Sequence, residues 1–317
     1  MRAIIVGHSG QDGTLLYQSL QEQGYTVLGF SRSSICTTDN HCSKVKPNIN
    51  DIQSIYALVE DFKPSEIYYL PAYHTSSECL EESSIKISFD LAQETHVTGL
   101  LNFLCVIRDI IPSCKLFYAS SSLIFSGKDG EVQVETTPLS PQGFYGITKA
   151  QGMWLCQEFR DRFGIFASVG ILYNHESHLR PHHFLSQKII QAAIRIASGS
   201  SEQLVVGDLS ARVDWGYAPD FIQGFQKILK LEQSGDFIIA SGRAHSVSEF
   251  AEITFKYFGL DFTNYIIEDS SILARRSLTK IGDPSKLKLA TNWECSFDFI
   301  DLIKQLIKES QNSTISR

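Results

Sequence analysis

The sequence lacks the charge pattern of a nucleic-acid-binding protein. Its 317 residues include 28 lysines and arginines against 35 aspartates and glutamates, which gives a formal net charge of −7. Nucleic-acid-binding domains present an excess of basic residues on one face, so this balance argues against such a partner. An anionic ligand has to be held by a few well-placed arginines, lysines and backbone N–H groups, because the net field of the protein repels it.

Paired cysteines and long apolar segments are also missing. The seven cysteines are scattered and include no CxxC pair, which is typical of free thiols in a reducing compartment and not of a disulfide framework or a zinc site. His182 and His183 are adjacent and do not share one face, so no metal site is predicted. A strand-like run follows Met1 without a basic segment or a long apolar core. We therefore expect a cytoplasmic protein with neither signal peptide nor membrane anchor.

What is present is an alternation of strand-like and helix-like segments. The strand-like runs in the first part of the chain are residues 3–6, 26–30, 66–70 and 115–119. Their alternation with stretches of helical periodicity is typical of βαβ units around a parallel sheet. We predict an α/β fold with a Rossmann-type doubly wound parallel sheet and a smaller α/β substrate-binding domain. The predicted boundaries are 1–175 with 214–245 for the first domain and 176–213 with 246–317 for the second.

Three glycines lie between the first predicted strand and the first predicted helix. The segment VGHSGQDGTLL places Gly7, Gly10 and Gly13 at GxxGxxG spacing. Small residues there let the backbone approach a pyrophosphate, and the N-terminus of the following helix offers unpaired N–H groups. A glycine triplet also fits an ordinary turn, but its place between strand and helix favours a bound dinucleotide.

The residues after the second predicted strand bear on the choice of cofactor. They read Ser31-Arg32-Ser33-Ser34. An acidic residue at this place accepts hydrogen bonds from a ribose 2′-hydroxyl, whereas an arginine beside serine hydroxyls suits a 2′-phosphate. The sequence therefore favours NADP over NAD, with a solvated surface arginine as the alternative. Asn48, after an expected third strand, is a candidate for hydrogen bonding to adenine or an ordinary loop residue.

A serine turn and a YxxxK pair supply candidate catalytic side chains. Tyr145 and Lys149 lie one helical turn apart, so both project from one face. A nearby ammonium lowers the pKa of a tyrosine, which lets the phenol exchange a proton with a sugar hydroxyl during hydride transfer. Ser122 follows a predicted strand, where its hydroxyl can share the reacting oxygen. A YxxxK pair alone occurs by chance in many helices, but a strand, a serine turn and a later YxxxK pair together indicate an active site.

With these motifs the chain resembles the extended short-chain dehydrogenase/reductase superfamily, and most closely the GDP-mannose 4,6-dehydratase family. The similar segments cover nearly the whole chain and include VGHSGQDGTLL, FYASSSLIFSGK, GFYGITKAQ, GILYNHESHLR and VGDLSARVDWGYAPD. The resemblance implies an NADP-dependent enzyme that acts on a nucleotide sugar, with a GDP-linked hexose favoured. It also implies hydride transfer at carbon 4 of the sugar and a place in deoxysugar or polysaccharide biosynthesis.

The resemblance also implies roles for individual residues. Catalysis would rest on Ser122, Tyr145 and Lys149, without a metal. The candidate cofactor contacts are Gly7, Gly10, Gln11, Asp12 and Gly13 at the pyrophosphate, Arg32 and Ser33 at the 2′-phosphate, and Asn48, Ile49, Leu70, Ala72, Tyr145, Lys149, His175 and Arg180 elsewhere. The candidate substrate contacts are Asn174, Lys188, Arg212, Arg275 and Arg276.

The serine turn departs from the family pattern at one decisive position. Aligned without gaps, the family's Ser-Thr-Ser-Glu-Leu-Tyr-Gly reads here as SSLIFSG, residues 121–127. Ile124 thus replaces the glutamate that removes the proton at carbon 5 and helps expel water from carbon 6. A positioned general base contributes about 10²–10⁴-fold in rate, so ordinary dehydration is expected to be crippled. Glu131 and Glu135 are near in sequence, but Glu135 lies in a turn and neither is a convincing replacement.

Two further departures bear on the substrate. Residues 73–88 form a longer segment than in the family, which alters a loop near the nicotinamide. The family's Arg-Asp-Trp becomes Val213-Asp214-Trp215, with Arg212 one position early. Because a shift by one residue in a strand points a side chain to the opposite face, Arg212 is not expected to reach the same phosphate.

Three functions remain open from the sequence. The favoured one is a nucleotide-sugar oxidoreductase or epimerase, such as a 4-keto reductase or a 4-dehydrogenase, that has lost or changed the elimination. The second is a true GDP-mannose 4,6-dehydratase, a lyase, with an atypical base. The third is an inactive paralogue that acts as a binding or regulatory subunit, against which intact Tyr145 and Lys149 count. The resemblance further implies a homodimer or homotetramer, with residues 35–46 as a candidate loop that reaches a neighbour's cofactor.

Overall fold

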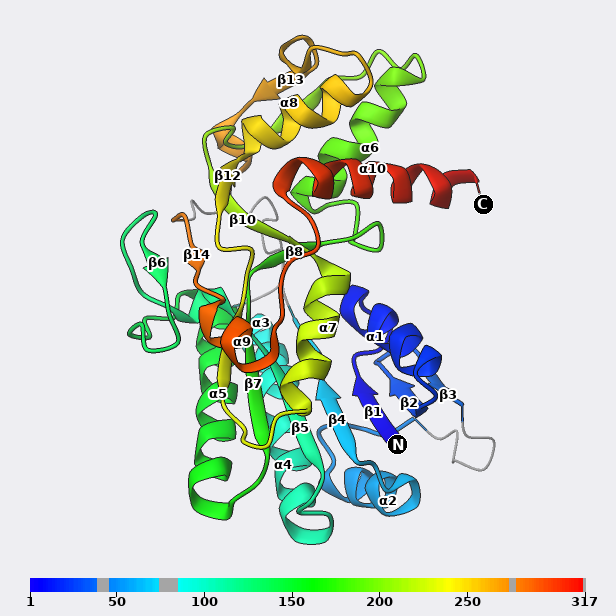
Figure 1. Cartoon of the computed structure of the whole chain (residues 1–317), viewed down its shortest axis with the longest axis vertical. Helices are drawn as coiled ribbons and strands as arrows, with labels where there is room; N and C mark the ends of the chain where they lie inside the picture. Colours follow the sequence, from blue (N-terminus) through cyan, green and yellow to red (C-terminus); the bar gives the residue numbers. More distant parts are fainter. Residues whose placement is uncertain (39–45, 74–84, 274–277, 316–317) are drawn as a thin grey trace.

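The computed structural model describes residues 1–38, 46–73, 85–273 and 278–315. Figure 1 shows a lower unit built around a sheet, which contains the N-terminus, and an upper unit, which contains the C-terminus. No helix of the described residues is long and apolar enough to cross a membrane.

A seven-stranded sheet forms the centre of the lower unit. Its spatial order is β11-β7-β5-β4-β1-β2-β3. The bounds are β1 Arg2–Val6, β2 Thr26–Phe30, β3 Ile35–Thr37, β4 Glu66–Tyr69, β5 Lys115–Ser121, β7 Ala167–Leu172 and β11 Asp236–Ile239. All neighbouring strands run parallel except β3, which runs antiparallel to β2. The predicted α/β class and Rossmann-type parallel sheet are confirmed.

The chain between β2 and Asn48 differs from the prediction. A third strand does precede Asn48, but this strand, β3, runs antiparallel to β2 and not parallel as expected. Instead the chain turns back directly after β2, where the Ser31 N–H donates to the Ser34 carbonyl at 2.8 Å. A tight turn of this kind can only return the next strand antiparallel, because a parallel neighbour needs a longer crossover.

Helices cover both faces of this sheet. One face carries α2 (Ile52–Phe62), α4 (Gly99–Ile110) and α5 (Gly143–Phe163), and the other carries α1 (Gln11–Glu22), α7 (Ala218–Leu229) and α9 (Ser285–Thr291). Successive side chains of a strand point to opposite faces, so Ile4 belongs to the first core and Ile5 to the second. The parallel sheet is therefore buried on both sides, as such sheets require.

Helix α9 comes from the part of the chain assigned by sequence to the smaller domain, yet it packs on the large sheet. Leu287 and Trp293 join the core formed by α1 and α7, and the Trp293 Nε1–H donates to the Asp220 carbonyl at 2.7 Å. The sequence prediction places residues 246–317 in the smaller domain, whereas this segment packs with the larger one. A short helical pattern does not reveal which of two apolar surfaces it will cover.

A third core holds the upper unit together. It includes α6 (Leu185–Ala197), α8 (Val247–Tyr257), α10 (Phe299–Ile315) and β9 (Leu204–Val206), which pairs with β13 (Ile266–Glu268). Ser246 caps α8 reciprocally with Glu249.

Three short strands connect the two units. They are β8 (Asn174–Glu176), β10 (Arg212–Tyr217) and β12 (Ala244–Ser246), which form one sheet in the order β12-β10-β8. Nearby, β6 (Val132–Gln133) pairs with β14 (Ile281–Gly282). The remaining helical segments are α3 (Ile85–Gln93), the π-helical turn η1 (Glu94–Thr98) and the 3₁₀ turns η2 (Ser122–Ile124), η3 (Phe262–Asn264) and η4 (Ser270–Ile272).

Candidate active site

A cleft of about 960 Å³ lies between the two units. The ends of β1, β4, β5 and β7 contribute residues on one side, and β8, β10 and the segment leading into α6 contribute residues on the other. Ligands of open α/β sheets bind outside the carboxyl ends of the strands. We therefore expect the predicted site to lie in this cleft.

The glycine turn fits the pyrophosphate of a dinucleotide. Gly7 adopts a φ of +87°, and its N–H donates to the Phe30 carbonyl at 2.8 Å. A Cβ on Gly13 would lie 2.4 Å from the Gly7 carbonyl oxygen, so glycine is required there. Gly10 precedes α1, whose first backbone N–H groups are available to an anion. The predicted residues Gly7, Gly10, Gln11, Asp12 and Gly13 all line the cleft.

Serines surround the place predicted for a 2′-phosphate. The Ser31 hydroxyl lies 3.2 Å from that of Ser33 and 3.1 Å from that of Ser34. Arg32 lines the cleft, and its guanidinium makes no ion pair with the described residues. Ser33 itself is outside the lining. The predicted residues Asn48, Ile49, Leu70 and Ala72 also line the cleft.

The structure brings the three predicted catalytic residues to one cleft. Tyr145 and Lys149 lie on α5, and Ser122 begins η2. The buried Lys149 Nζ donates to the Ala119 carbonyl at 2.7 Å and lies 5.7 Å from the centre of the Tyr145 ring. Burial lowers the pKa of Lys149 to about 7, against the opposing charge of Asp12. Phenol, ammonium and serine hydroxyl are thus arranged for proton exchange with a substrate oxygen.

A buried histidine beside the tyrosine is a residue that sequence reasoning missed. His96 lies on η1, and its ring meets that of Tyr145 edge-on at 5.3 Å between centres. Its Nε2 accepts from the Tyr73 N–H at 2.9 Å, so Nδ1 carries the proton and donates to Thr148 Oγ1 at 2.7 Å. This fixed ring packs against Tyr145. The only sequence signal was a single histidine beside Glu94, Thr95 and Thr98, in the segment between the strands predicted at residues 66–70 and 115–119.

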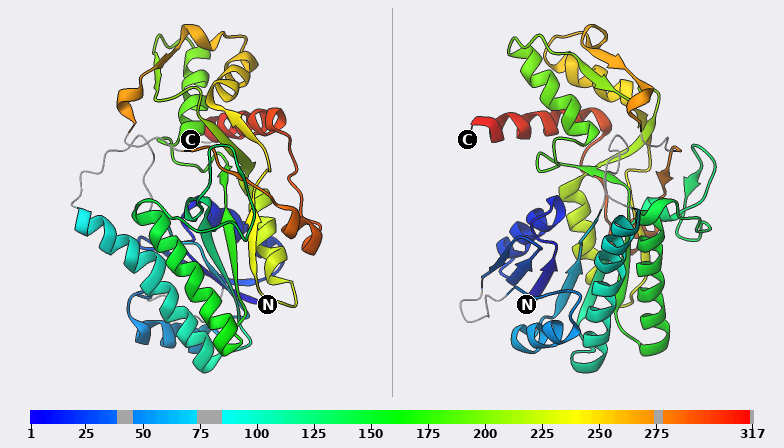
Figure 2. Two further views of the ribbon diagram at one scale, coloured as in Figure 1. Left: turned by 90° about the vertical axis from the view of Figure 1, so that its left-hand side faces the viewer. Right: turned by 180° about the vertical axis from the view of Figure 1, so that it is seen from behind.

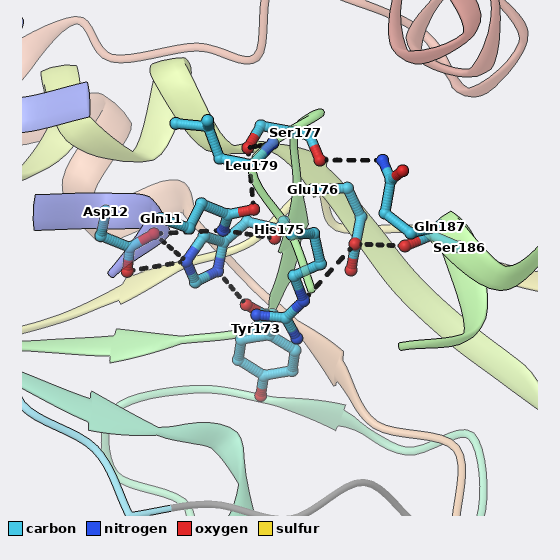
Figure 3. A network of polar contacts seen from close by, with 10 residues as sticks. Gln11, Asp12, Tyr173, His175, Glu176, Ser177, Leu179, Ser186 and Gln187 are labelled. Carbon is cyan, nitrogen blue, oxygen red and sulfur yellow. Dashed lines mark hydrogen bonds and ion pairs between the residues drawn. The ribbon is translucent and has the colours of Figure 1, made fainter. Parts of the chain in front are cut away.

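A polar network joins β8 to the glycine turn (Figure 3). His175 Nε2 contacts the Asp12 carboxylate, and the Gln11 side chain donates to the His175 carbonyl at 3.1 Å. The Ser177 hydroxyl donates to Gln11 Oε1 at 2.9 Å. The network anchors the chain that enters the upper unit to the N-terminus of α1.

The remaining predicted contacts differ in their placement. Asn174, His175 and Arg180 line the cleft, and the Arg180 guanidinium stacks on Phe184 with an ion pair to Glu176 at 3.6 Å. Lys188 lies on α6 but is not part of the lining. Arg275 and Arg276 lie outside the described residues, as do most of residues 73–88 and 35–46.

Arg212 and its neighbour Val213 both line the cleft. The Arg212 guanidinium is held by the Ala244 carbonyl at 2.6 Å and by Glu249 at 3.8 Å. Its charge is therefore partly compensated by the carboxylate of Glu249 in the first turn of α8.

Ile124 points away from the cleft. Its side chain is fully buried in the core below the sheet, while the preceding Leu123 lines the cleft. The two nearby glutamates are used elsewhere: Glu135 accepts from the Ile238 N–H at 2.9 Å, and Glu131 accepts from the Lys128 N–H at 3.0 Å. Within the described chain, neither supplies a carboxylate to the serine turn.

The described residues show neither a metal site nor a disulfide. No group of three or more metal-ligating side chains occurs among the residues that the structure describes. The cysteines in that part of the chain are free thiols, namely Cys36, Cys105, Cys114, Cys156 and Cys295.

Comparison with known proteins agrees with this fold. The family model described as GDP-mannose 4,6 dehydratase matches residues 4–306. GDP-mannose 4,6 dehydratase 2 of Arabidopsis thaliana is 32% identical over 97% of this chain and 86% of its own length.

Two solved structures share the fold at low identity. The dTDP-glucose 4,6-dehydratase of Bacillus anthracis, in complex with NAD, has a TM-score of 0.81 at 16% identity and covers 99% of this chain and 98% of its own. RMD from Pseudomonas aeruginosa, complexed with NADPH, has a TM-score of 0.79 at 18% identity, with 98% and 99% covered. From the family match over nearly its whole length, the chain belongs to the GDP-mannose 4,6 dehydratase family of nucleotide-sugar enzymes.

Proposed function

We propose that this chain is an NADP-dependent enzyme that oxidises or reduces carbon 4 of a nucleotide-linked hexose without eliminating water. The expected activities are those of a 4-keto reductase, a 4-dehydrogenase or an epimerase, and a GDP-linked hexose is the favoured substrate. One observation supports the proposal: Ser122, Tyr145 and Lys149 share one cleft with the glycine turn, while Ile124, at the position where the resemblance implies the elimination base, is buried.

Each catalytic side chain has a separate task in this proposal. The bound nicotinamide would supply a hydride donor or acceptor for carbon 4. Tyr145 exchanges a proton with the oxygen on that carbon, and the Ser122 hydroxyl shares a hydrogen bond with the same oxygen. The Lys149 ammonium, held by the Ala119 and Pro71 carbonyls, favours the ionised form of the phenol. No residue of the serine turn can remove the proton at carbon 5.

The proposed cofactor preference depends on Arg32. Arg32 and its neighbour Ser31 both line the cleft, and Arg32 has no carboxylate partner among the described residues. A phosphate could accept charge-assisted hydrogen bonds from the guanidinium and the serines. A ribose 2′-hydroxyl, by contrast, finds no acidic acceptor at the end of β2.

Mass spectrometry of products tests the proposed reaction. Purified protein is incubated with NADP or NADPH and matched GDP-hexoses and GDP-4-ketohexoses. We expect a gain or loss of two hydrogens, or an unchanged mass with inverted configuration at carbon 4. Loss of water from a GDP-hexose would instead establish a dehydratase with another base. Tyr145→Phe should bind cofactor normally and lower kcat by about 10²–10⁴-fold, and unchanged turnover would refute the assignment of Tyr145.

We also propose that two copies associate through α4 and α5. These helices lie side by side in Figure 2 and pack against one another. Their outer surface exposes apolar side chains: Trp154 is 51% exposed, Ile147 37% and Leu101 36%. Ile147 and Trp154 are two helical turns apart and share one face of α5. Exposed apolar side chains on two adjoining helices support a protein–protein interface at this surface.

A further inference from the structure

Lys280 lies at the end of the cleft that is next to the catalytic serine turn. It immediately precedes β14 and lines the cleft with Ser122, Leu123 and Tyr145. Its Nζ donates to the Phe125 carbonyl at 3.0 Å, and Phe125 directly follows η2. The ammonium is therefore fixed against the turn that carries Ser122, at the end where the reacting sugar would lie.

The charge of Lys280 has no counterion within the described residues. Three other cations of the cleft are paired with carboxylates, namely His175 with Asp12, Arg180 with Glu176 and Arg212 with Glu249. Arg32, at the place proposed for the cofactor phosphate, and Lys149, held by the Ala119 and Pro71 carbonyls, have no carboxylate partner among the described residues. Lys280 is half-buried, no acidic side chain of the described residues lies within 4 Å of it, and burial lowers its pKa. An ammonium held in this way is stabilised when a ligand supplies the missing negative charge.

The acidic side chains of the cleft do not balance this charge. Each is occupied elsewhere, in the pairs Asp12 with His175, Glu94 with Asn50, Glu176 with Ser186, Asp208 with Ser210, and Asp214 with Ser241. At the position where the resemblance implies a glutamate, the chain has Ile124, which lies in the core. This end of the cleft therefore carries the Lys280 ammonium and no carboxylate from the serine turn.

We propose that Lys280 binds a carboxylate on the hexose, so that the preferred substrate is a nucleotide-linked hexuronate. The inference rests on the proposed function at carbon 4 and adds the class of sugar. A hexuronate carries its carboxylate at carbon 6 and has no 6-hydroxyl to eliminate. The same substrate thus accounts both for the unpaired ammonium and for the missing elimination base.

Binding to an inactive variant tests this inference apart from catalysis. Titration calorimetry with Tyr145→Phe, saturated with NADP, would compare GDP-mannuronate with GDP-mannose, and UDP-glucuronate with UDP-glucose. Each pair differs only at carbon 6. We expect the hexuronate to bind about 10- to 100-fold more tightly in at least one pair, as a charge-assisted hydrogen bond predicts. Adding Lys280→Met should abolish the difference, and adding Lys280→Arg should retain most of it.

The control is Lys128→Met, which removes an exposed lysine near the same turn but outside the lining. It should leave the hexuronate preference unchanged. Equal binding of both sugars, or a preference that survives Lys280→Met in a folded protein, would overturn the inference. If either result overturns the inference, turnover of neutral hexoses at carbon 4 by the wild type would still support the proposed function. Hexuronate binding without any reaction at carbon 4 would overturn the proposed function alone.

Discussion

His175 Nε2 lies 3.0 Å from both carboxylate oxygens of Asp12, which joins β8 to the first turn of α1. On the other side of the ring, Nδ1 lies 2.7 Å from the Tyr173 carbonyl. Both partners only accept hydrogen bonds, so both ring nitrogens carry protons and the imidazole is charged. Burial disfavours that charge, but Asp12 outweighs it and raises the pKa of His175. The cation thereby offsets a carboxylate that would otherwise repel a pyrophosphate at the glycine turn.

Asp12→Asn should lower the pKa of His175 and destabilise the protein in a defined pH range. Burial alone would raise the pKa of Asp12, but His175 keeps it lowered. The ion pair between Asp12 and His175 stabilises the folded protein fully at pH values between 3.8, the ordinary pKa of aspartate, and 6.5, the ordinary pKa of histidine. This stabilisation is lost as pH falls through the lowered pKa of Asp12 or rises through the raised pKa of His175.

Urea denaturation at a series of pH values measures this effect. The free energy of unfolding should fall by about 1–3 kcal/mol between these limits and by less outside them. Asp161→Asn, at an exposed position of α5, is the matched control and should change little at any pH. A loss for Asp12→Asn that is independent of pH would show that the pair is not an ion pair.

Arg32→Ala should weaken NADP binding and spare NAD. The guanidinium at the end of β2 is proposed to hold the 2′-phosphate, which NAD lacks. Loss of a charge-assisted contact should reduce the affinity for NADP by about 10- to 100-fold, while the affinity for NAD stays within about twofold. Calorimetric titration of both cofactors measures the ratio. Arg162→Ala, an exposed arginine of α5, serves as control, and an equal loss for both cofactors would refute the role of Arg32.

Trp154→Glu should convert the proposed dimer into a monomer. The indole is half exposed on the outer face of α5. A carboxylate buried in an apolar interface loses more free energy by desolvation than the remaining contacts gain on association. Light scattering coupled to gel filtration should show half the mass of the wild type with an unchanged circular dichroism spectrum. Tyr257→Glu, an exposed aromatic on α8, is the control. A wild-type protein that is already monomeric would refute the interface.

The residues at the floor of the cleft were predictable because their motifs are local. A glycine turn between a strand and a helix, and a YxxxK pair on one helix, fix geometry within a few residues, so Gly7, Gly13, Tyr145 and Lys149 were found from sequence. Ser122 was found because its hydroxyl follows a strand whose end defines the cleft.

Residues that reach the cleft from distant segments were not predictable in the same way. Lys280 lines the cleft because β14 pairs with β6 across about half of the chain's length, and no local pattern encodes that pairing. His96 depends on a π-helical turn that rotates its ring toward Tyr145. The packing of α9 on the large sheet likewise depends on which apolar surface it meets.

The opposite placements of Ile124, in the core, and Leu123, in the cleft, give a last prediction about the proposed loss of the elimination base. Ile124→Glu would place a carboxylate in the apolar core, where burial raises its pKa. The folded protein then binds a proton more tightly than the unfolded chain, so stability falls as pH rises above the ordinary Glu value of about 4.3. We expect a loss of about 2–4 kcal/mol at neutral pH and a smaller loss near pH 5, measured by urea denaturation. Leu123→Glu, whose side chain lines the cleft, should cost less than about 1 kcal/mol. Neither variant should release water from a GDP-hexose, and dehydration by Ile124→Glu would show that residue 124 can turn into the cleft.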